Sequence, residues 1–320
     1  MSLLVVGSVA YDTIETHSER RNDVLGGSAS YFSIASSYFT AVKLIAVVGN
    51  DFKKKDMDLF NSHAINLSGL EIKPGKTFRW SGVYGENVNN RQTLSTNLNV
   101  FSDFSPKLDL SHIESPYLFL ANIDPTLQLD VLTQMKKRPR LTALDTMDFW
   151  ISGSKASLIK VIQKVDILFI DSNEALSLTG ENNITKAARQ IQNMGPGILV
   201  IKKGEHGATL FNENSMFIAP AYPVVNVVDP TGAGDSFAGG FMGVLAASDG
   251  DIDDISLRRA TIMGSIMGSY AVQNFSTSGL DALTLADVTA RYNNIWAMSN
   301  FEPIEESKTL PWRSQFKNHG

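Results

Sequence analysis

The chain contains no cysteine among its 320 residues. Disulfide bonds, thiolate nucleophiles and cysteine-ligated zinc sites are therefore excluded. No apolar stretch approaches the roughly 20 residues that a transmembrane helix needs. The apolar residues 1–7 have no basic segment before them and are too few for a secretory signal. We therefore expect a cytoplasmic protein that does not act at a membrane.

An excess of positive charge is also missing. The chain has 28 Lys and Arg against 33 Asp and Glu, which gives a net charge of -5. This balance gives no support for binding nucleic acid, and an anionic substrate would need a local positive field or a metal ion. With 43% hydrophobic and 19% charged residues, the composition is that of an ordinary globular protein. No clear linker divides the chain, so we expect a single domain over residues 1–320.

Glycine is concentrated in residues 229–241, whose sequence is DPTGAGDSFAGGF. The apolar residues 224–228 before it predict a buried strand, and a helix is expected from 232 to about 247 with the Thr231 hydroxyl as its N-cap. Gly232 and Gly234 let the backbone come close to a ligand, and the amides at the helix start remain free. The pattern therefore predicts an anion site.

Asp235 places a carboxylate in the first turn of this helix. A passive phosphate site would avoid a negative charge there, because the charge repels the ligand. An enzyme that deprotonates an alcohol beside a phosphate would need one. The alternative is that Asp235 only complements the helix dipole. The neighbouring glycines and the strand predicted before them favour the role of a base.

Strands and helices alternate along most of the chain, which predicts an α/β fold with a mostly parallel sheet and helices on both faces. The expected strands are 3–7, 42–49, 117–120, 141–144, 167–170 and 198–201, with a hairpin at 208–219. The expected helices are 28–39, a short one from 51, 127–137, 151–164, 171–180, 184–194 and 257–273.

Residues 77–84 alternate apolar with polar side chains, which is typical of a half-exposed antiparallel strand. Residues 91–96 can pair with it, and we expect this hairpin to form a lid on the main sheet. Phe78, Trp80 and Tyr84 fall on one face of the strand. They either pack within the hairpin or stack on a substrate.

Three further features have both a functional and a plain interpretation. Asp12 follows the first strand, where α/β sheets place ligand contacts, but it could also cap a turn. Gly26 and Gly27 either approach a substrate or form a turn. Gly264 and Gly268 belong to a ridge of small residues on the helix 257–273, which fits either a helix–helix contact or a slot for a flat purine.

Residues 229–237 closely resemble the C-terminal signature of the ribokinase family, also called PfkB carbohydrate kinases. Residues 26–29 (GGSA) resemble the family's N-terminal glycine pair, and residues 203–208 (KGEHGA) resemble its nucleotide-side turn. Residues 178–180 (LTG) are similar to a segment that follows its magnesium-associated motif. The matches extend from residue 3 to about 280 and thus cover most of the chain.

The resemblance implies a ribokinase-like three-layer α/β/α sandwich, with lid strands inserted at about 11–23 and 72–100. It implies phosphorylation of a hydroxymethyl group with ATP and Mg²⁺, and a homodimer through the lid. The expected catalytic groups are the base Asp235 and the anion hole of Gly232, Ala233 and Gly234. The expected binding residues are Asp12, Gly26, Gly27 and Tyr31 for the substrate, and Lys203, Gly204, Gly207, Gly264 and Gly268 for the nucleotide. Metal contacts would come from Glu174 through water, from Asp171, and from Asp229 and Thr231 to a monovalent cation such as K⁺.

Two residues depart from the family pattern. Asp171 replaces the asparagine of the Asn-x-x-Glu motif, although Glu174 is kept. Tyr31 stands where many sugar kinases have an asparagine, and together with the lid aromatics it favours an adenosine-like nucleoside over ribose or fructose.

A simple-sugar kinase and a non-catalytic member of the fold that senses a ligand both remain open, the second because of Asp171. A dinucleotide-dependent oxidoreductase is disfavoured, because Phe237 occupies the third glycine position of Gly-x-Gly-x-x-Gly.

Overall fold

The computed structural model describes residues 2–17, 19–85, 91–213, 215–248 and 252–302. The strands of its large sheet are β1 (Ser2–Val6), β4 (Ala41–Gly49), β5 (Asn66–Lys73), β8 (Tyr117–Leu120), β9 (Leu141–Asp145), β10 (Ile167–Asp171), β11 (Ile198–Lys202), β12 (Ala208–Phe211) and β13 (Met216–Ala219). Their order in the sheet is β13-β12-β11-β10-β9-β8-β1-β4-β5. The sheet is parallel from β11 to β5, and only β12 and β13 run antiparallel to their neighbours.

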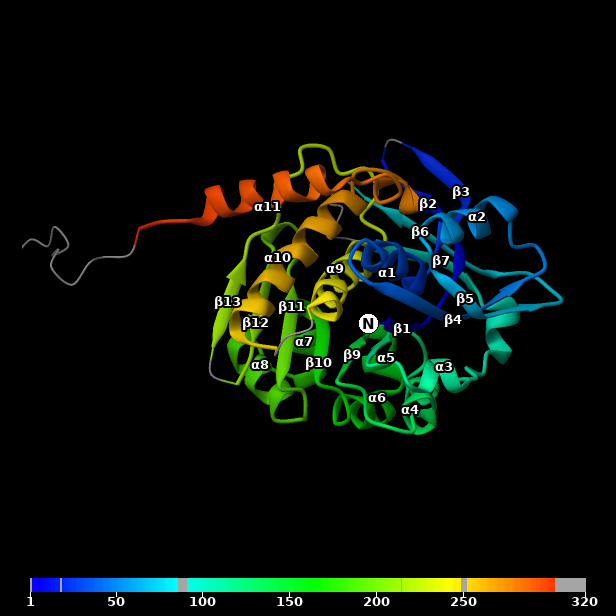
Figure 1. The fold of residues 1–320 in the computed structure, drawn as a ribbon, viewed down its shortest axis with the longest axis horizontal. Coiled ribbons are helices and arrows are strands. Elements are labelled where there is room, and N and C mark those ends of the chain that lie inside the picture. Colours follow the sequence, from blue (N-terminus) through cyan, green and yellow to red (C-terminus); the bar gives the residue numbers. More distant parts are fainter. Residues whose placement is uncertain (1, 18, 86–90, 214, 249–251, 303–320) are drawn as a thin grey trace, which may run out of the picture.

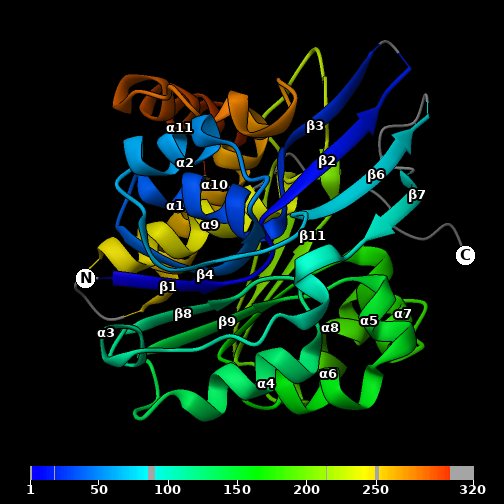
Figure 2. The same ribbon diagram turned by 90° about the vertical axis from the view of Figure 1, so that its right-hand side faces the viewer.

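Helices cover both faces of this sheet (Figures 1 and 2). One face carries α1 (Ser28–Ser37), α2 (Lys54–Ser62), α9 (Ala233–Ala247), α10 (Asp254–Ala271) and α11 (Leu285–Ser299). The other carries α3 (Leu110–Ile113), α4 (Pro125–Gln134), α5 (Asp148–Gly153), α6 (Lys155–Ile162), α7 (Ser172–Thr179) and α8 (Ile184–Gln192). Alternate residues of β1 enter two separate cores, Leu3 on the first face and Leu4 on the second. This explains why the strands are apolar throughout, and it confirms the predicted three-layer arrangement.

A second, four-stranded sheet projects from one end of the large one (Figure 2). It consists of β2 (Ala10–Glu15), β3 (Arg20–Gly26), β6 (Phe78–Tyr84) and β7 (Arg91–Asn97), in the order β3-β2-β6-β7. We call these four strands the lid sheet. The predicted antiparallel pairing of β6 with β7 is present, and β2 joins β6 in parallel. That this sheet closes over a substrate remains a prediction.

The strand predicted at 224–228 is wrong. These residues form no strand, and Val225 is 96% exposed. The amides of Val228 and Asp229 both donate to the carbonyl oxygen of Val272, at 2.8 and 3.2 Å. The segment therefore passes outside the sheet and is fixed by the end of α10. An apolar run of this length does not by itself show that a neighbouring strand is available.

Helix boundaries differ from the predictions by a few residues in several places, for example in α4, predicted at 127–137, and α10, predicted at 257–273. The helix predicted over 151–164 is divided into α5 and α6 at Ser154, whose φ of -137° is not helical. The short helix predicted from residue 51 begins at Lys54. Of the helices within the described residues, none combines the length and the apolar character that crossing a membrane requires.

Candidate active site

The helix α9 begins at Ala233 rather than at the position that sequence reasoning gave it. Its N-cap is Gly232, in a left-handed conformation with φ 76°, and no side chain among the described residues caps the helix. The prediction that Thr231 is the N-cap is therefore wrong. A Cβ on Gly232 would lie only 2.3 Å from Cγ and Cδ1 of the Tyr31 ring, which is too close for any side chain. Only glycine fits here, and no described side chain competes with an anion for the first amides of α9, although the Ala233 amide donates to the Pro230 carbonyl oxygen at 3.3 Å.

Asp235 lies in the first turn of α9, where its side chain is half-buried. Desolvation and then the neighbouring Asp145 raise the pKa of Asp235 to about 7, although Lys202 and Arg91 act in the opposite direction. A carboxylate with a pKa near neutrality can take a proton from an alcohol and release it again. The position and the electrostatics of Asp235 thus suit a general base.

Two charged residues beside this helix start were not found from the sequence. Lys202 ends β11 and Asp145 ends β9, and the Lys202 ammonium lies 2.9 and 3.0 Å from the two carboxylate oxygens of Asp145. Burial would lower the pKa of Lys202, but Asp145 and then Glu174 raise it above its usual value. Both residues stand at the carboxyl ends of predicted strands, so the rule that ligand contacts lie there could have identified them.

Asp12 forms the opposite wall of the site. It lies in β2 and is only 4% exposed. Gly26 and Gly27 allow this arrangement: a Cβ on Gly26 would clash with the Asp12 carboxylate, and one on Gly27, at φ 90°, would lie 2.5 Å from the Ser8 carbonyl oxygen. Desolvation, then the charge of Asp229, and also that of Asp235, raise the pKa of Asp12 to about 8. Asp12, beside the glycine pair, and Asp235, in the glycine-rich motif, therefore interact electrostatically.

Two tyrosines contact the glycine-rich motif, Tyr84 from β6 of the lid sheet and Tyr31 from α1. The Tyr84 hydroxyl of β6 and the Thr231 hydroxyl are 2.9 Å apart and share a hydrogen bond. The ring of Tyr31 packs against Gly232, and the Tyr31 hydroxyl is buried without a partner among the described residues. Tyr31, predicted to contact substrate, thus lies within the wall of the site and supports the backbone of the motif.

Asp229 fixes the loop that precedes α9. Its side chain is fully buried, and its two oxygens accept hydrogen bonds from the amides of Thr231, at 2.9 Å, and Ser276, at 3.2 Å. Burial raises the pKa of Asp229, and these hydrogen bonds oppose the increase. Asp229 and Thr231 are thus adjacent in a site that remains a predicted position for a monovalent cation.

Asp171 and Glu174 form a capping box at the start of α7. Asp171 accepts from the Glu174 amide at 2.8 Å, and Glu174 accepts from the Asp171 amide at 2.9 Å. Burial is the main reason that the pKa of Glu174 rises to about 8, and Lys202 opposes the rise while Asp171 adds to it. Within the described ranges, no three acidic or histidine side chains are grouped to hold a metal directly. Glu174 therefore fits a contact through metal-bound water better than a place in a direct ligand cluster.

The predicted nucleotide turn directly follows Lys202. Gly204 and Gly207 have φ of 55° and 84°, and the Lys203 amide donates to the Gly207 carbonyl oxygen at 2.8 Å. Left-handed glycines and a short backbone bond define a tight turn at the end of β11.

The ridge of small residues on α10 packs against α9. A Cβ on Gly264 would lie 2.9 Å from the Phe237 ring, so Phe237 occupies the slot that was predicted for a purine at this position. A helix–helix contact accounts for Gly264. Gly268 is half-buried and lies beside the Ala233 carbonyl oxygen, and it remains a candidate contact for the nucleotide.

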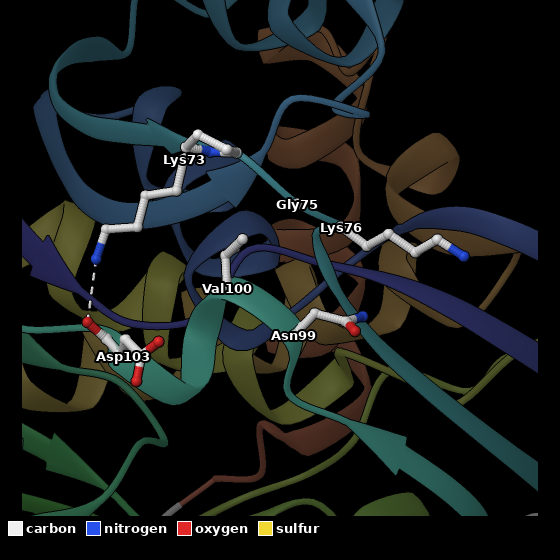
Figure 3. A pocket seen from close by; sticks show the side chains of 7 residues that line it. Lys73, Gly75, Lys76, Asn99, Val100 and Asp103 are labelled. Atoms are coloured by element: carbon white, nitrogen blue, oxygen red, sulfur yellow. Dashed lines mark hydrogen bonds between the residues drawn. The ribbon is translucent and has the colours of Figure 1, made fainter.

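A cavity of about 490 Å³ lies apart from these residues, where the large sheet connects to the lid sheet. Figure 3 shows that the side chains of Lys73 and Lys76 on its wall point in different directions. The Lys73 ammonium donates to the Asp103 carbonyl oxygen at 3.0 Å. None of the predicted site residues lines this cavity, and its two cations do not converge on a common point.

A known protein family and a curated protein match most of the chain. The family model described as pfkB family carbohydrate kinase matches residues 2–282. A cytidine kinase of Thermococcus kodakarensis is 31% identical over 251 residues, which are 76% of this chain and 87% of that protein.

Two solved structures have the same fold. One is the nucleoside kinase of Methanocaldococcus jannaschii, an archaeal member of the ribokinase family, with a TM-score of 0.73 at 19% identity over 92% of this chain and 98% of that one. The other is a fructokinase of Vibrio cholerae with bound fructose, ADP and calcium ion, with a TM-score of 0.73 at 18% identity over 91% and 98% of the two chains. The predicted ribokinase-like fold is thereby confirmed.

Proposed function

The chain belongs to the pfkB family of carbohydrate kinases, and on that premise we propose that it transfers the γ-phosphoryl group of ATP to a hydroxymethyl group of a nucleoside. The observation that carries this proposal is the position of Asp235. A carboxylate with a pKa near 7 lies in the first turn of a helix that no described side chain caps, opposite the buried Asp12. The start of this helix can therefore both remove the proton of the acceptor hydroxyl and stabilise the negative charge of the phosphoryl group.

In the proposed reaction, Asp235 accepts the proton of the acceptor hydroxyl while the oxygen of that hydroxyl attacks the γ-phosphorus of ATP. The bond from that phosphorus to the leaving oxygen breaks, and Asp235 later releases the proton to solvent. The amides of Gly232, Ala233 and Gly234 stabilise the negative charge that develops, and each such donor is worth about 10²–10³ in rate. Magnesium bound with ATP would neutralise phosphate charge, with Glu174 holding its water. Asp12 would orient the acceptor through hydrogen bonds to its other hydroxyls.

The lid sheet supports a nucleoside as the acceptor. Trp80 is the register partner of Asp12 in the β2–β6 pair, so both side chains lie on the same face of the lid sheet. The indole lies over Gly82, where any Cβ would clash with it. Phe78, by contrast, stacks on Phe101 with ring centroids 5.4 Å apart. Since Tyr31 and Tyr84 contact the glycine-rich motif, Trp80 is the aromatic residue best placed to stack on a base.

The acceptor is tested by ADP release with adenosine, inosine, cytidine, ribose and fructose. Our sequence reasoning favours an adenosine-like base, and the cytidine kinase relative adds cytidine to the set. We expect nucleosides to be preferred. We expect Trp80→Leu to raise the KM for the nucleoside about 5- to 150-fold, since stacking of one base contributes about 1–3 kcal/mol. Trp80→Phe, which keeps an aromatic face, is the matched control and should have a smaller effect.

Activity on simple sugars alone would contradict the nucleoside proposal and favour the sugar-kinase alternative. Binding of a nucleoside without any ADP release would favour a non-catalytic, ligand-sensing member of the fold. Activation by K⁺ through Asp229 and Thr231, and dimerisation through the lid sheet, remain predictions. Assays with K⁺ replaced by a larger organic cation, and sedimentation, would test them.

A further inference from the structure

One partly buried cation, Lys202, lies beside the start of α9. The side chain of Lys202 is 17% exposed and that of its partner Asp145 is 5% exposed. In the part of the chain that the structure describes, the two Asp145 oxygens are the only hydrogen-bond acceptors of the ammonium. An ammonium group has three hydrogens to donate, so one of them remains free for a further acceptor.

The Lys202 ammonium lies directly against the glycine-rich motif. A Cβ on Gly234 would lie 3.0 Å from Nζ and 3.7 Å from Cδ and Cε of Lys202. The end of the lysine side chain therefore occupies the side-chain face of Gly234, next to the amides that form the proposed anion hole. The same lysine is followed immediately by the predicted nucleotide turn at Gly204. Lys202 thus stands between the two parts of the site that would hold a polyphosphate.

The charged side chains around Lys202 are mostly negative. Carboxylates from three elements face Lys202, namely Asp145 of β9, Glu174 of α7 and Asp235 of α9. Asp12 of β2 and Arg91 of β7 act on Asp235 from the side of the lid sheet. One lysine among these carboxylates reduces the repulsion that an incoming phosphate would otherwise meet.

We propose that Lys202 binds the terminal phosphoryl group of a nucleoside triphosphate, and that Asp145 is a positioning residue that holds the ammonium beside Gly234. The inference rests on the proposed function, and it adds the positively charged side chain of Lys202 to the proposed anion hole. It also explains the glycine at position 234, because a larger side chain would displace the ammonium. The alternative is that the ion pair only fastens the ends of β9 and β11 to each other.

The test is a comparison of two ligands by titration calorimetry in the presence of Mg²⁺, the β,γ-imido analogue of ATP and ADP. We expect Lys202→Met to weaken binding of the ATP analogue about 10- to 100-fold, as for a lost hydrogen bond to a charged group, and to change ADP binding much less. Asp145→Asn should weaken analogue binding by an intermediate factor. Lys55→Met, which removes an exposed lysine of α2, is the matched control and should behave as the wild type.

An equal effect of Lys202→Met on both ligands, or no effect, would overturn the proposal. Removal of the lysine alone leaves a buried carboxylate unpaired and can prevent folding. The double variant Lys202→Met/Asp145→Asn avoids that charge and must show the same selective loss. If the wild type phosphorylates no acceptor but the selective loss is found, the proposed function fails and the phosphate contact stands. If the wild type is active and the variants bind both ligands normally, only the role of Lys202 fails.

A kinetic measurement adds a second readout. Lys202 lowers the pKa of Asp235, so its removal should move the acidic limb of the kcat/KM profile to higher pH. Because this electrostatic effect does not require a bound phosphate, the limb reports the position of the ammonium beside Asp235, and an unmoved limb would contradict that position.

Discussion

Replacing Gly232 by alanine tests whether the glycine-rich motif is built as described. The backbone of Gly232 has φ 76°, which costs a residue with a Cβ about 1–2 kcal/mol. The new methyl group would also clash with Cγ and Cδ1 of the buried Tyr31 ring, and overpacking of this kind costs about 1–3 kcal/mol. The two effects together predict a loss of about 2–5 kcal/mol in the free energy of unfolding.

Urea unfolding followed by circular dichroism measures this loss, and the chain offers a matched control. Gly180 has φ 74°, but a Cβ there would meet no atom within 4 Å. Gly180→Ala should therefore show only the backbone cost of about 1–2 kcal/mol. In a double-mutant cycle, the cost of Gly232→Ala should fall in a Tyr31→Leu background, because the ring is gone. A cost for Gly232→Ala no larger than that for Gly180→Ala would refute the packing of Tyr31 against the motif.

Three other variants have definite expected outcomes. Burial raises the pKa of Asp12 from 3.8 to about 8. Between pH 3.8 and about 8, the folded protein therefore keeps a proton on Asp12 that the unfolded chain has lost, and the free energy of unfolding falls as the pH rises. Asp12→Asn should therefore gain about 0.5–2 kcal/mol over the wild type towards the upper end of this window while acceptor binding weakens, and a stability difference that is independent of pH would contradict this. Tyr84→Phe removes the hydrogen bond to Thr231, which should lower the free energy of unfolding by about 0.5–1.5 kcal/mol and speed amide hydrogen exchange in β6. Unchanged exchange would show that this hydrogen bond does not hold the lid sheet in place. Tyr31→Phe deletes a buried hydroxyl without a described partner, so urea unfolding should show stability kept or increased, and a loss above about 1 kcal/mol would reveal a missed partner.

The architecture was largely predictable because it depends on patterns within short segments. The alternation of apolar strands with helices predicted the parallel sheet, and the period of two in β6 predicted its antiparallel pairing with β7. Residues 224–228 were misassigned because their apolar side chains resemble those of a buried strand. Whether a strand forms there depends on a neighbour at the sheet edge, which a local pattern does not report.

The site was predictable where a residue type is unusual for its position. Asp235 is conspicuous as a carboxylate at an anion-binding helix start, and the glycines at 26, 27 and 232 are required by close approach or by positive φ. Lys202 and Asp145 are 57 residues apart and meet only because β9 and β11 both flank β10 in the sheet. Thr231 lost its expected role as N-cap because the chain turns left-handed at Gly232 before the helix begins.

The most direct test of the central claim is the turnover of Asp235→Asn with the preferred acceptor. The variant keeps the shape of the side chain but cannot accept a proton, so kcat should fall by at least about 10² while folding and ATP binding are retained. In the wild type, kcat/KM should fall as pH decreases through about 7, the pKa of Asp235. Near-normal turnover of a folded Asp235→Asn protein would contradict the assignment of Asp235 as the base.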